Sequence, residues 1–382
     1  MHVLTYTSLY PTNQKPVHGI FVRELVRSLS RMLQVQVLAP ENGLRKLLER
    51  PRQGPLPAVP DDNALRCRFW TVPKFLKSLD GRLMATFSRR AFARATVTRP
   101  DLVHAHYAYP DGAAAALLAR RAGLPLVITC HGSDINVLAQ DRVRKPLIRR
   151  TLSQASAVVA VSRALAGRIA DLGVDPASIH HIPNGVDLSR FPMGDKSQAR
   201  RLLGLHGESR LLVAAGRLEP VKGYDRLLKA LALLDAVRLV IVGDGSLAGQ
   251  LCRLAQDLGI SDRVSFAGMV PHTGLAPYFQ AADALVISSH SEGWPTVIHE
   301  AMSSGTPVVA PAVGGIPEAL ADPSLGLIVS SGEPDVLAAG ISRALGIRWD
   351  PAVLRRAAAE HDWDVVARRH VELYEQVLRQ TL

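Results

Sequence analysis

Short apolar runs alternate with amphipathic helical stretches along nearly the whole chain, and this alternation restricts the fold more than any other feature. Such a pattern is typical of parallel sheets that are covered by helices on both faces. At 382 residues the chain is long for one core and fits two domains. We predict an α/β protein with two doubly wound parallel sheets. The strands are expected near residues 2–8, 35–40, 101–107, 125–130, 157–162 and 179–182, and then near 211–215, 238–242, 264–267, 284–288, 307–310 and 326–329.

A turn signal, Pro183-Asn184-Gly185, separates the two halves of the pattern. The alternation of strands and helices restarts directly after it, so we place the interdomain hinge there. Residues 1–184 are expected to form one Rossmann-like domain and residues 185–360 a second. Ligands of such sheets bind beyond the carboxyl ends of the strands, which is where a site is expected.

Two glutamates, Glu292 and Glu300, are separated by seven residues and follow a predicted strand. Pro295 stands at a predicted first helical position, which puts Glu292 in a loop and Glu300 on the helix. Both carboxylates can then face one ligand. The amides of Thr296 and Val297 are first-turn donors without a partner inside the helix, and such donors bind phosphate. Carboxylates beside an anion site suggest a nucleotide sugar.

Further motifs lie at the ends of other predicted strands. They are Gly216-Arg217-Leu218-Glu219-Pro220-Val221-Lys222-Gly223, His131-Gly132-Ser133-Asp134, Pro183-Asn184-Gly185-Val186-Asp187, Val242-Gly243-Asp244-Gly245 and Gly314-Gly315-Ile316-Pro317-Glu318. With the glutamate pair, these motifs resemble those of the retaining family 4 glycosyltransferases, which have the GT-B fold and an E-x7-E signature. The resemblance covers nearly the whole chain. It implies two Rossmann-like domains that face a deep cleft, and a C-terminal helix, residues 361–382, that crosses back to the N-terminal domain.

The resemblance also implies roles for individual residues. Glu300 matches the glutamate that binds the ribose hydroxyls of the nucleotide, and Glu292 matches the one that holds the donor sugar. His131 matches a histidine close to the donor sugar and the reaction centre. Each residue also has a structural interpretation: Glu300 as a solvated helix residue, and His131 as a side chain that only satisfies a backbone carbonyl.

The nucleotide base is expected along Gly268-Met269-Val270, where Met269 and Val270 would contact it mainly through the backbone. Gly19 would let the first helix approach the phosphates closely. The chain has a single glycine in Val17-His18-Gly19-Ile20, where relatives have a Gly-Gly pair, so its contacts in this first loop are expected to differ.

Arg217 and Lys222 supply positive charge at a predicted strand end. Sugar transfer from a nucleoside diphosphate needs stabilisation of a diphosphate whose negative charge grows in the transition state. A planar guanidinium, a compact ammonium and first-turn amides can replace a metal ion in that role. No Asp-x-Asp follows a strand, so we predict that the reaction needs no metal and no cofactor. Alternatively, both residues are ordinary surface charges.

Two histidines, His104 and His106, alternate on a predicted strand and share one face. Two histidines make a poor metal site, and no third ligand is evident in the sequence. We interpret them as structural, with the alternative that one lines the acceptor site.

Positive charge is concentrated in residues 64–99, which hold nine Lys or Arg against one acid, Asp80. The bulky apolar residues Trp70, Phe87 and Phe92 are interleaved with them, among others. Such a basic amphipathic surface fits anionic lipid better than nucleic acid, and it suits a lipid-linked acceptor. The alternative is a solvated face over plain core. The net charge of +11 by itself does not separate these partners.

The three cysteines, Cys67, Cys130 and Cys252, are scattered without a pairing pattern, which favours a reducing cytoplasm. Apolar runs are too short for a spanning helix. We expect a cytoplasmic enzyme, peripheral on the inner face of the membrane.

The sequence thus favours a retaining, metal-independent glycosyltransferase that uses a nucleotide-sugar donor and a lipid-linked or polysaccharide-precursor acceptor. UDP- and GDP-linked donors both fit. Two other interpretations stay open: a GT-B sugar-nucleotide epimerase, and a non-catalytic module that binds a nucleotide sugar or nucleic acid. Transfer, epimerisation or binding without turnover would separate the three.

Overall fold

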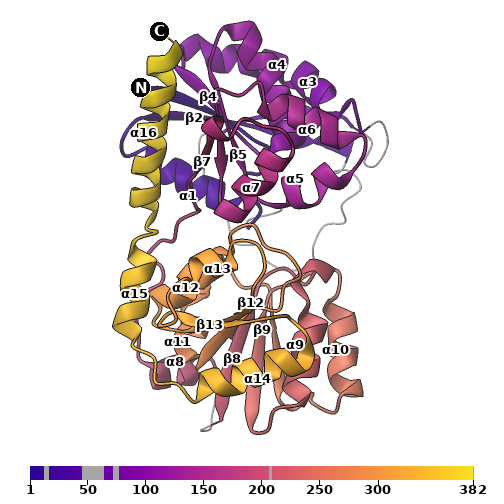
Figure 1. Ribbon diagram of the computed structural model, residues 1–382, viewed down its shortest axis with the longest axis vertical. Helices are drawn as coiled ribbons and strands as arrows, with labels where there is room; N and C mark the ends of the chain where they lie inside the picture. Colours follow the sequence, from indigo (N-terminus) through magenta and orange to yellow (C-terminus); the bar gives the residue numbers. More distant parts are fainter. Residues whose placement is uncertain (13–16, 45–63, 72–76, 206–208, 382) are drawn as a thin grey trace. The chain divides into compact units, whose positions relative to one another are not determined.

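The computed structural model describes residues 1–12, 17–44, 64–71, 77–205 and 209–381. The chain divides into two compact units (Figure 1). Unit 1 comprises Met1–Asn184 together with Trp363–Leu382, and unit 2 comprises Gly185–Asp362. Each unit has one sheet in which every paired strand is parallel, so the predicted pair of doubly wound α/β sheets is confirmed.

The sheet of unit 1 has the order β3-β2-β1-β4-β5-β6-β7. Helices cover it, and the C-terminal helix α16 (Trp363–Thr381) packs beside α1 (Ile20–Leu29). Trp363, Val366 and Tyr374 of α16 are buried in the same core as Leu25 and Leu29 of α1. The strands are β1 (His2–Tyr6), β2 (Gln34–Asn42), β3 (Leu65–Phe69), β4 (Leu102–His106), β5 (Leu126–Cys130), β6 (Ala157–Ala160) and β7 (Ile179–His181), and the other helices are α3 (Asp80–Ala95), α4 (Ala113–Ala122), α5 (Ser133–Asn136), α6 (Arg144–Leu152) and α7 (Arg163–Asp171).

The sheet of unit 2 has the order β10-β9-β8-β11-β12-β13. Its strands are β8 (Arg210–Ala215), β9 (Val237–Val242), β10 (Val264–Gly268), β11 (Ala284–Val286), β12 (Val308–Pro311) and β13 (Gly326–Val329). Its helices are α8 (Lys196–Leu202), α9 (Tyr224–Ala232), α10 (Ala248–Asp257), α11 (Ala276–Ala281), α12 (Thr296–Ser303), α13 (Ile316–Ala319), α14 (Pro334–Leu345) and α15 (Pro351–Ala359).

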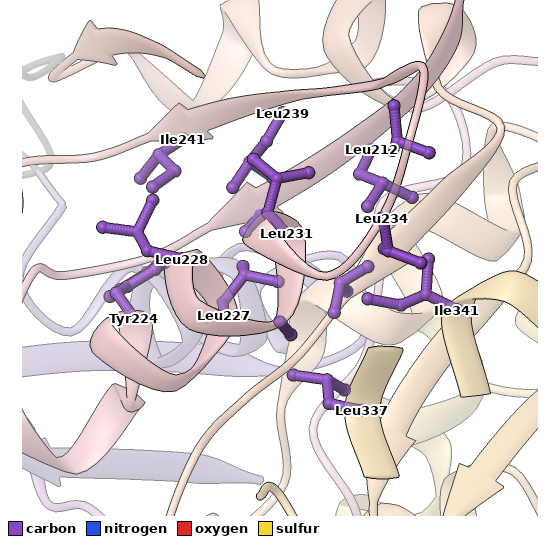
Figure 2. Packing of buried hydrophobic residues seen from close by; sticks show 14 of the residues in the cluster. Leu212, Tyr224, Leu227, Leu228, Leu231, Leu234, Leu239, Ile241, Leu337 and Ile341 are labelled. Atoms are coloured by element: carbon purple, nitrogen blue, oxygen red, sulfur yellow. The ribbon is translucent and has the colours of Figure 1, made fainter. Parts of the chain in front are cut away.

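One face of the unit 2 sheet is packed against α9 and α14 (Figure 2). Leu227, Leu228 and Leu231 of α9 recur at helical spacing and are fully buried against Leu239 and Ile241 of β9. Burial of one such leucine stabilises the fold by about 1.5–3 kcal/mol. The core therefore carries the stability of the unit, and the loops beyond the strand ends remain available for binding.

One strand, β3, was not predicted. Its sequence Leu-Arg-Cys-Arg-Phe alternates apolar and basic residues. Among the described residues it pairs with β2 alone and so forms the edge of the sheet. An edge strand needs less apolar sequence than a central one because fewer of its side chains are covered. We interpret this segment only as part of a basic surface, so the strand is a finding of the structure, and its two arginines remain exposed.

Both sheets have the strand order of doubly wound folds, in which the direction of winding reverses beside the first strand. In unit 1 the reversal lies between β1 and β4, and in unit 2 it lies between β8 and β11. Loops that leave two neighbouring strands on opposite sides at this point create the usual ligand site.

Candidate functional site

In unit 2 the reversal point brings Lys222 and Glu292 together. Lys222 follows β8, and Glu292 follows β11. The Nζ atom of Lys222 lies 2.6 Å from Oε1 of Glu292, and the Ser289 hydroxyl donates to the same oxygen at 2.6 Å. Within the described residues Oε2 of Glu292 accepts no hydrogen bond, and it is not among the buried atoms that lack a partner. One carboxylate oxygen is therefore fixed, and the other is open to a ligand hydroxyl.

Glycine holds the backbone of Glu292 in place. Gly314, in the loop after β12, has φ of 56°, and a Cβ atom added there would lie 1.8 Å from the carbonyl oxygen of Glu292. No other residue fits this position without moving the backbone of Glu292. The Gly314-Gly315 motif of the sequence therefore has a structural explanation: it lets the loop after β12 press against the site loop.

Glu300 is buried on α12, with a relative exposure of 7%. Its Oε1 lies 3.0 Å from Nε2 of His272. Nδ1 of His272 in turn lies 2.9 Å from Nη1 of the Arg190 guanidinium. Arg190 in turn pairs with Asp187 at 3.2 Å. Glu300 is thus not a solvated helix residue, since it is held from one side within unit 2.

The helix start differs from the prediction by one position. Pro295 is the N-cap residue of α12 and not its first helical residue, because the helix spans Thr296–Ser303. Its φ of −76° and ψ of 98° are extended, as expected for a residue just outside a helix. Thr296 and Val297 remain the first two helical residues, so their amides still lack an acceptor four residues back.

The other predicted donor residues of unit 2 lie at strand ends. Arg217 follows β8 and is exposed, and within the described parts of the chain it forms no ion pair such as that of Lys222. Met269 and Val270 follow β10 and are half-buried, two and one residues before Pro271-His272. These two residues are therefore close in sequence to His272, which contacts Glu300.

In unit 1 Gly19 precedes α1 in a left-handed conformation with φ of 67°. A Cβ atom there would lie 2.2 Å from the carbonyl oxygen of Leu9. The close approach that Gly19 allows is therefore to the loop after β1. This contact gives the glycine a structural reason that is independent of any phosphate.

His131 follows β5 and joins a buried histidine cluster. Its Nε2 lies 3.1 Å from Nδ1 of His106, and its ring lies 4.5 Å from that of Phe21. The ring of His106 is in turn 4.2 Å from that of His104. His104 Nδ1 lies 2.7 Å from the Tyr374 hydroxyl on α16, and His370 also contacts His104, with ring centroids 5.6 Å apart. The C-terminal helix is therefore connected to His131 through side chains.

Burial keeps this cluster neutral. Loss of solvent, together with a smaller effect of the neighbouring His370, lowers the pKa of His131 to about 3. Burial lowers the pKa of His370 to about 4, although a hydrogen bond to the Val366 carbonyl opposes the effect. The pKa values of His104 and His106 are also well below their ordinary value because of burial. A neutral His131 can donate one hydrogen bond and accept one, of which the contact at Nε2 is already made with His106. With a pKa of about 3 it carries no charge near pH 7.

These shifts predict a loss of stability in acid. Unfolded histidines have a pKa of about 6.5, so between that value and the folded values the unfolded chain binds more protons than the folded one. The free energy of unfolding should fall as pH drops below about 6.5, by about 1.4 kcal/mol per pH unit for each of His131 and His370. Urea unfolding at pH 7.5 and 5.5, followed by circular dichroism, measures the free energy of unfolding at each pH.

Asp111 opposes this trend, because burial raises its pKa to about 7 and its folded form then binds a proton that the unfolded form loses. Burial likewise raises the pKa of Asp134. Because four histidines act against two carboxyls, we expect the net effect of acid to be a loss of stability. A His370→Phe variant should show a shallower dependence on pH than the parent. Equal stability of the parent at both pH values would contradict the prediction.

Several residues that the sequence analysis does not identify contact the predicted site residues in the structure. His272, Arg190 and Ser289 contact the two glutamates or their partners, and Tyr374 contacts the histidine cluster. Ser289 could have been found, since it precedes Glu292 in the same loop. The others are distant in sequence, and only tertiary packing makes them neighbours. Among the residues that the structure describes, no group of three or more His, Cys, Asp or Glu is placed to hold a metal ion.

Known families match both units. Residues 18–190 match the family described as Glycosyltransferase Family 4, and residues 195–361 match the family described as Glycosyl transferases group 1. A Bacillus subtilis protein named as the teichuronic acid biosynthesis glycosyltransferase TuaC is 32% identical over 335 residues, which cover 83% of this chain and 82% of the relative. The chain belongs to the family 4-like glycosyltransferases. A D-inositol 3-phosphate glycosyltransferase of Segniliparus rotundus is 35% identical over 302 residues, which cover 74% of this chain and 67% of that protein.

Solved structures of low sequence identity share the fold of this glycosyltransferase. Sucrose-phosphate synthase from Thermosynechococcus elongatus has a TM-score of 0.79 at 23% identity, with 99% of each chain covered. Anabaena HepE, in complex with UDP and glucose, has a TM-score of 0.77 at 22% identity, with 98% of this chain and 100% of HepE covered. The GT-B fold expected from the sequence is confirmed by these likenesses.

Proposed function

We propose that this glycosyltransferase transfers a sugar, with retention of configuration, from a nucleoside-diphosphate donor to a polysaccharide-precursor or lipid-linked acceptor. The observation that carries the proposal is the Lys222–Glu292 pair at the reversal point of the unit 2 sheet, with the buried Glu300 on the helix that follows. A relative named for teichuronic acid biosynthesis supports a saccharide acceptor, and a solved structure with UDP and glucose supports a nucleotide-sugar donor.

Each residue then has a chemical task. The ammonium of Lys222 and the exposed guanidinium of Arg217 offset the charge that develops on the departing diphosphate, and the amides of Thr296 and Val297 add donors. Lys222 already pairs with the Glu292 carboxylate. When the donor binds, its diphosphate becomes a second anion beside the Lys222 ammonium. Glu292 accepts hydrogen bonds from hydroxyls of the donor sugar through its open oxygen. Glu300 accepts hydrogen bonds from the ribose hydroxyls.

His131, His106 and Gly19 belong to unit 1. We assign His131 the role of a neutral hydrogen-bond partner of the sugar near the reaction centre. Its low pKa, about 3, supports this assignment because a neutral imidazole can donate to or accept from a hydroxyl without adding charge. Met269 and Val270 are assigned to the nucleotide base.

Incubation with a panel of radiolabelled nucleotide sugars, with and without a lipid-linked saccharide, tests the proposal. Transfer of label to the acceptor with an unchanged anomeric configuration, read by proton NMR of the product, would support it. Interconversion of the sugar without transfer would instead indicate an epimerase, and binding without turnover would indicate a non-catalytic module. The relatives give neither alternative support.

We further propose that transfer needs no metal ion, since Lys222, Arg217 and the α12 amides supply the positive charge. Addition of EDTA to the transfer assay is therefore expected to leave the initial rate within about twofold of the untreated enzyme. A loss of activity that manganese or magnesium restores would show that a metal ion neutralises the diphosphate.

The basic surface of unit 1 offers a site for anionic membrane. Trp70 and Phe87 are 42% and 45% exposed, and Arg82, Arg89 and Arg90 are exposed on α3. The apolar part of this surface is smaller than predicted, because Phe69 and Phe92 are core residues with exposures of 5% and 4%. Lys74, Phe75 and Leu76, which the prediction included, lie outside the described residues. Within the described chain, none of the helices has the length and apolar character to cross a bilayer.

Vesicle co-sedimentation checks this surface. Binding to anionic vesicles should rise with the fraction of anionic lipid and fall with added salt, because each basic residue near the membrane contributes about 1 kcal/mol that salt screens. Changing Arg82, Arg89 and Arg90 to glutamate should release the protein. The same charge change at Arg201, Arg253 and Arg343, which are exposed on unit 2, serves as the control. Parent protein that stays in the supernatant at low salt would indicate a solvated face and a soluble acceptor.

A further inference from the structure

His272 and Arg190 are the residues that hold Glu300, and the sequence motifs assign a task to neither. His272 lies just after β10, and Arg190 lies in the segment that opens unit 2. Both contacts of the His272 ring nitrogens are short: 2.9 Å from Nδ1 to Arg190 and 3.0 Å from Nε2 to Glu300. The imidazole is therefore a bridge between a fixed cation and a fixed carboxylate.

The chemistry of arginine determines where the proton of a neutral His272 lies. A guanidinium can only donate, so Nδ1 of His272 must accept with its lone pair. The proton of the neutral ring then lies on Nε2, which donates to Oε1 of Glu300. The opposite tautomer would place two donors against each other at Nδ1 and leave Oε1 facing a lone pair. Arg190 thus selects the one tautomer that can hold the carboxylate.

The bridge rests on rigid supports. The ring of Phe191, which is fully buried, contacts His272 edge-on with centroids 5.2 Å apart. Arg355 of α15 donates to the carbonyl of Phe191 at 3.0 Å and to that of Ser303, the last residue of α12, at 2.7 Å. The segment that carries Arg190 and the helix that carries Glu300 are therefore tied together at a second point.

Only one oxygen of Glu300 is used by this bridge. Among the described residues no hydrogen bond to Oε2 is recorded, and that oxygen is not one of the buried unpaired atoms. A carboxylate has lone pairs for about four hydrogen bonds. Because His272 holds Glu300 through Oε1, the remaining lone pairs of the carboxylate face one direction. Two neighbouring hydroxyls of one sugar can donate to them together.

We propose that Arg190 and His272 position Glu300 for the two ribose hydroxyls of a nucleoside diphosphate, with His272 as the positioning residue and Arg190 as the residue that sets its tautomer. This inference rests on the proposed use of a nucleotide donor. It predicts that discrimination between ribose and deoxyribose depends on His272, although His272 does not contact the nucleotide. A residue that only stabilised the fold would change affinity or melting temperature without changing that discrimination.

Isothermal titration calorimetry with UDP, 2′-deoxy-UDP, GDP and 2′-deoxy-GDP tests the inference on the full-length protein. The parent should prefer the ribonucleotide of the bound base by about tenfold, the value of one hydrogen bond to a charged group. His272→Phe keeps a ring against Phe191 but cannot donate, and its preference should fall to about twofold. His272→Gln keeps a donor at a similar reach and should retain most of the preference. His180→Phe, in β7 of unit 1, is the matched control and should behave as the parent.

Retention of the tenfold preference in His272→Phe would overturn the inference and leave the proposed function intact. Failure of the parent to bind any of the four nucleotides would overturn both. Nitrogen-15 NMR of histidine-labelled protein gives a second measurement that does not depend on how the Phe variant folds. The His272 signals, assigned by their loss in His272→Gln, should show a neutral ring protonated at Nε2. A ring protonated at Nδ1 would rule out the bridge.

Discussion

Lys222→Ala is expected to lower the turnover number about 10²–10³-fold while leaving the protein folded. Loss of one preorganised donor at a site of developing charge typically has an effect of this size. Lys222 is partly exposed, with 25% of its side chain accessible, and it makes no contribution to the buried core. The turnover number is measured at saturating donor, with circular dichroism to check the fold.

Lys229→Ala is the matched control, since Lys229 lies on α9 of the same unit with half of its side chain exposed and only a 3.9 Å contact to Asp225. It should keep the parental turnover number. A turnover number near that of the parent for Lys222→Ala would remove Lys222 from the reaction.

The ion pair with Glu292 adds a second measurement to this prediction. If Lys222 acted only by holding Glu292, the double variant Lys222→Ala, Glu292→Gln would be no slower than the slower single variant. If Lys222 instead contacts the diphosphate and Glu292 the sugar, the two losses should largely add. The logarithm of the rate loss is measured for each single variant and for the double variant. The sum of the two single-variant values, compared with the double-variant value, distinguishes the two cases.

Glu300→Gln and Glu292→Gln are expected to change different kinetic parameters. Glu300 would hold the ribose equally in the ground and transition states, so its loss should mainly raise the donor KM, by about tenfold. Glu292 would hold the reacting sugar, and its loss should mainly lower kcat. Initial rates over a range of donor concentrations give both parameters. Equal changes in both parameters for both variants would show that these roles are wrong.

The control for this pair is Glu360→Gln, an exposed residue after α15, which should leave both parameters unchanged. Glutamine at position 300 can still accept a hydrogen bond from His272 through its amide oxygen. The substitution therefore tests the charge of Glu300 with little disturbance of the bridge, which the His272 variants test separately.

The sequence alone determined the layered architecture. Strand and helix periods are local properties of the sequence. The apolar run Leu211–Ala215 indicates a buried strand whichever strand it pairs with. Leu227, Leu228 and Leu231 recur at the helical period and mark one helix face. The same local logic put Glu292 in a loop and Glu300 on a helix. It failed at β3, where the edge position relaxes the apolar pattern, and at Pro295, where the N-cap and the first helical residue differ by only one position.

Tertiary structure alone decided which of these residues meet. Lys222 and Glu292 become neighbours because β8 and β11 are adjacent in the sheet, although 70 residues separate them, and no local period specifies strand order. His272 reaches Glu300, and Tyr374 of the last helix reaches His104, for the same reason. The chemical type of a side chain and its place on an element follow from nearby sequence. Its partners, its burial and hence its protonation follow only from how distant elements pack.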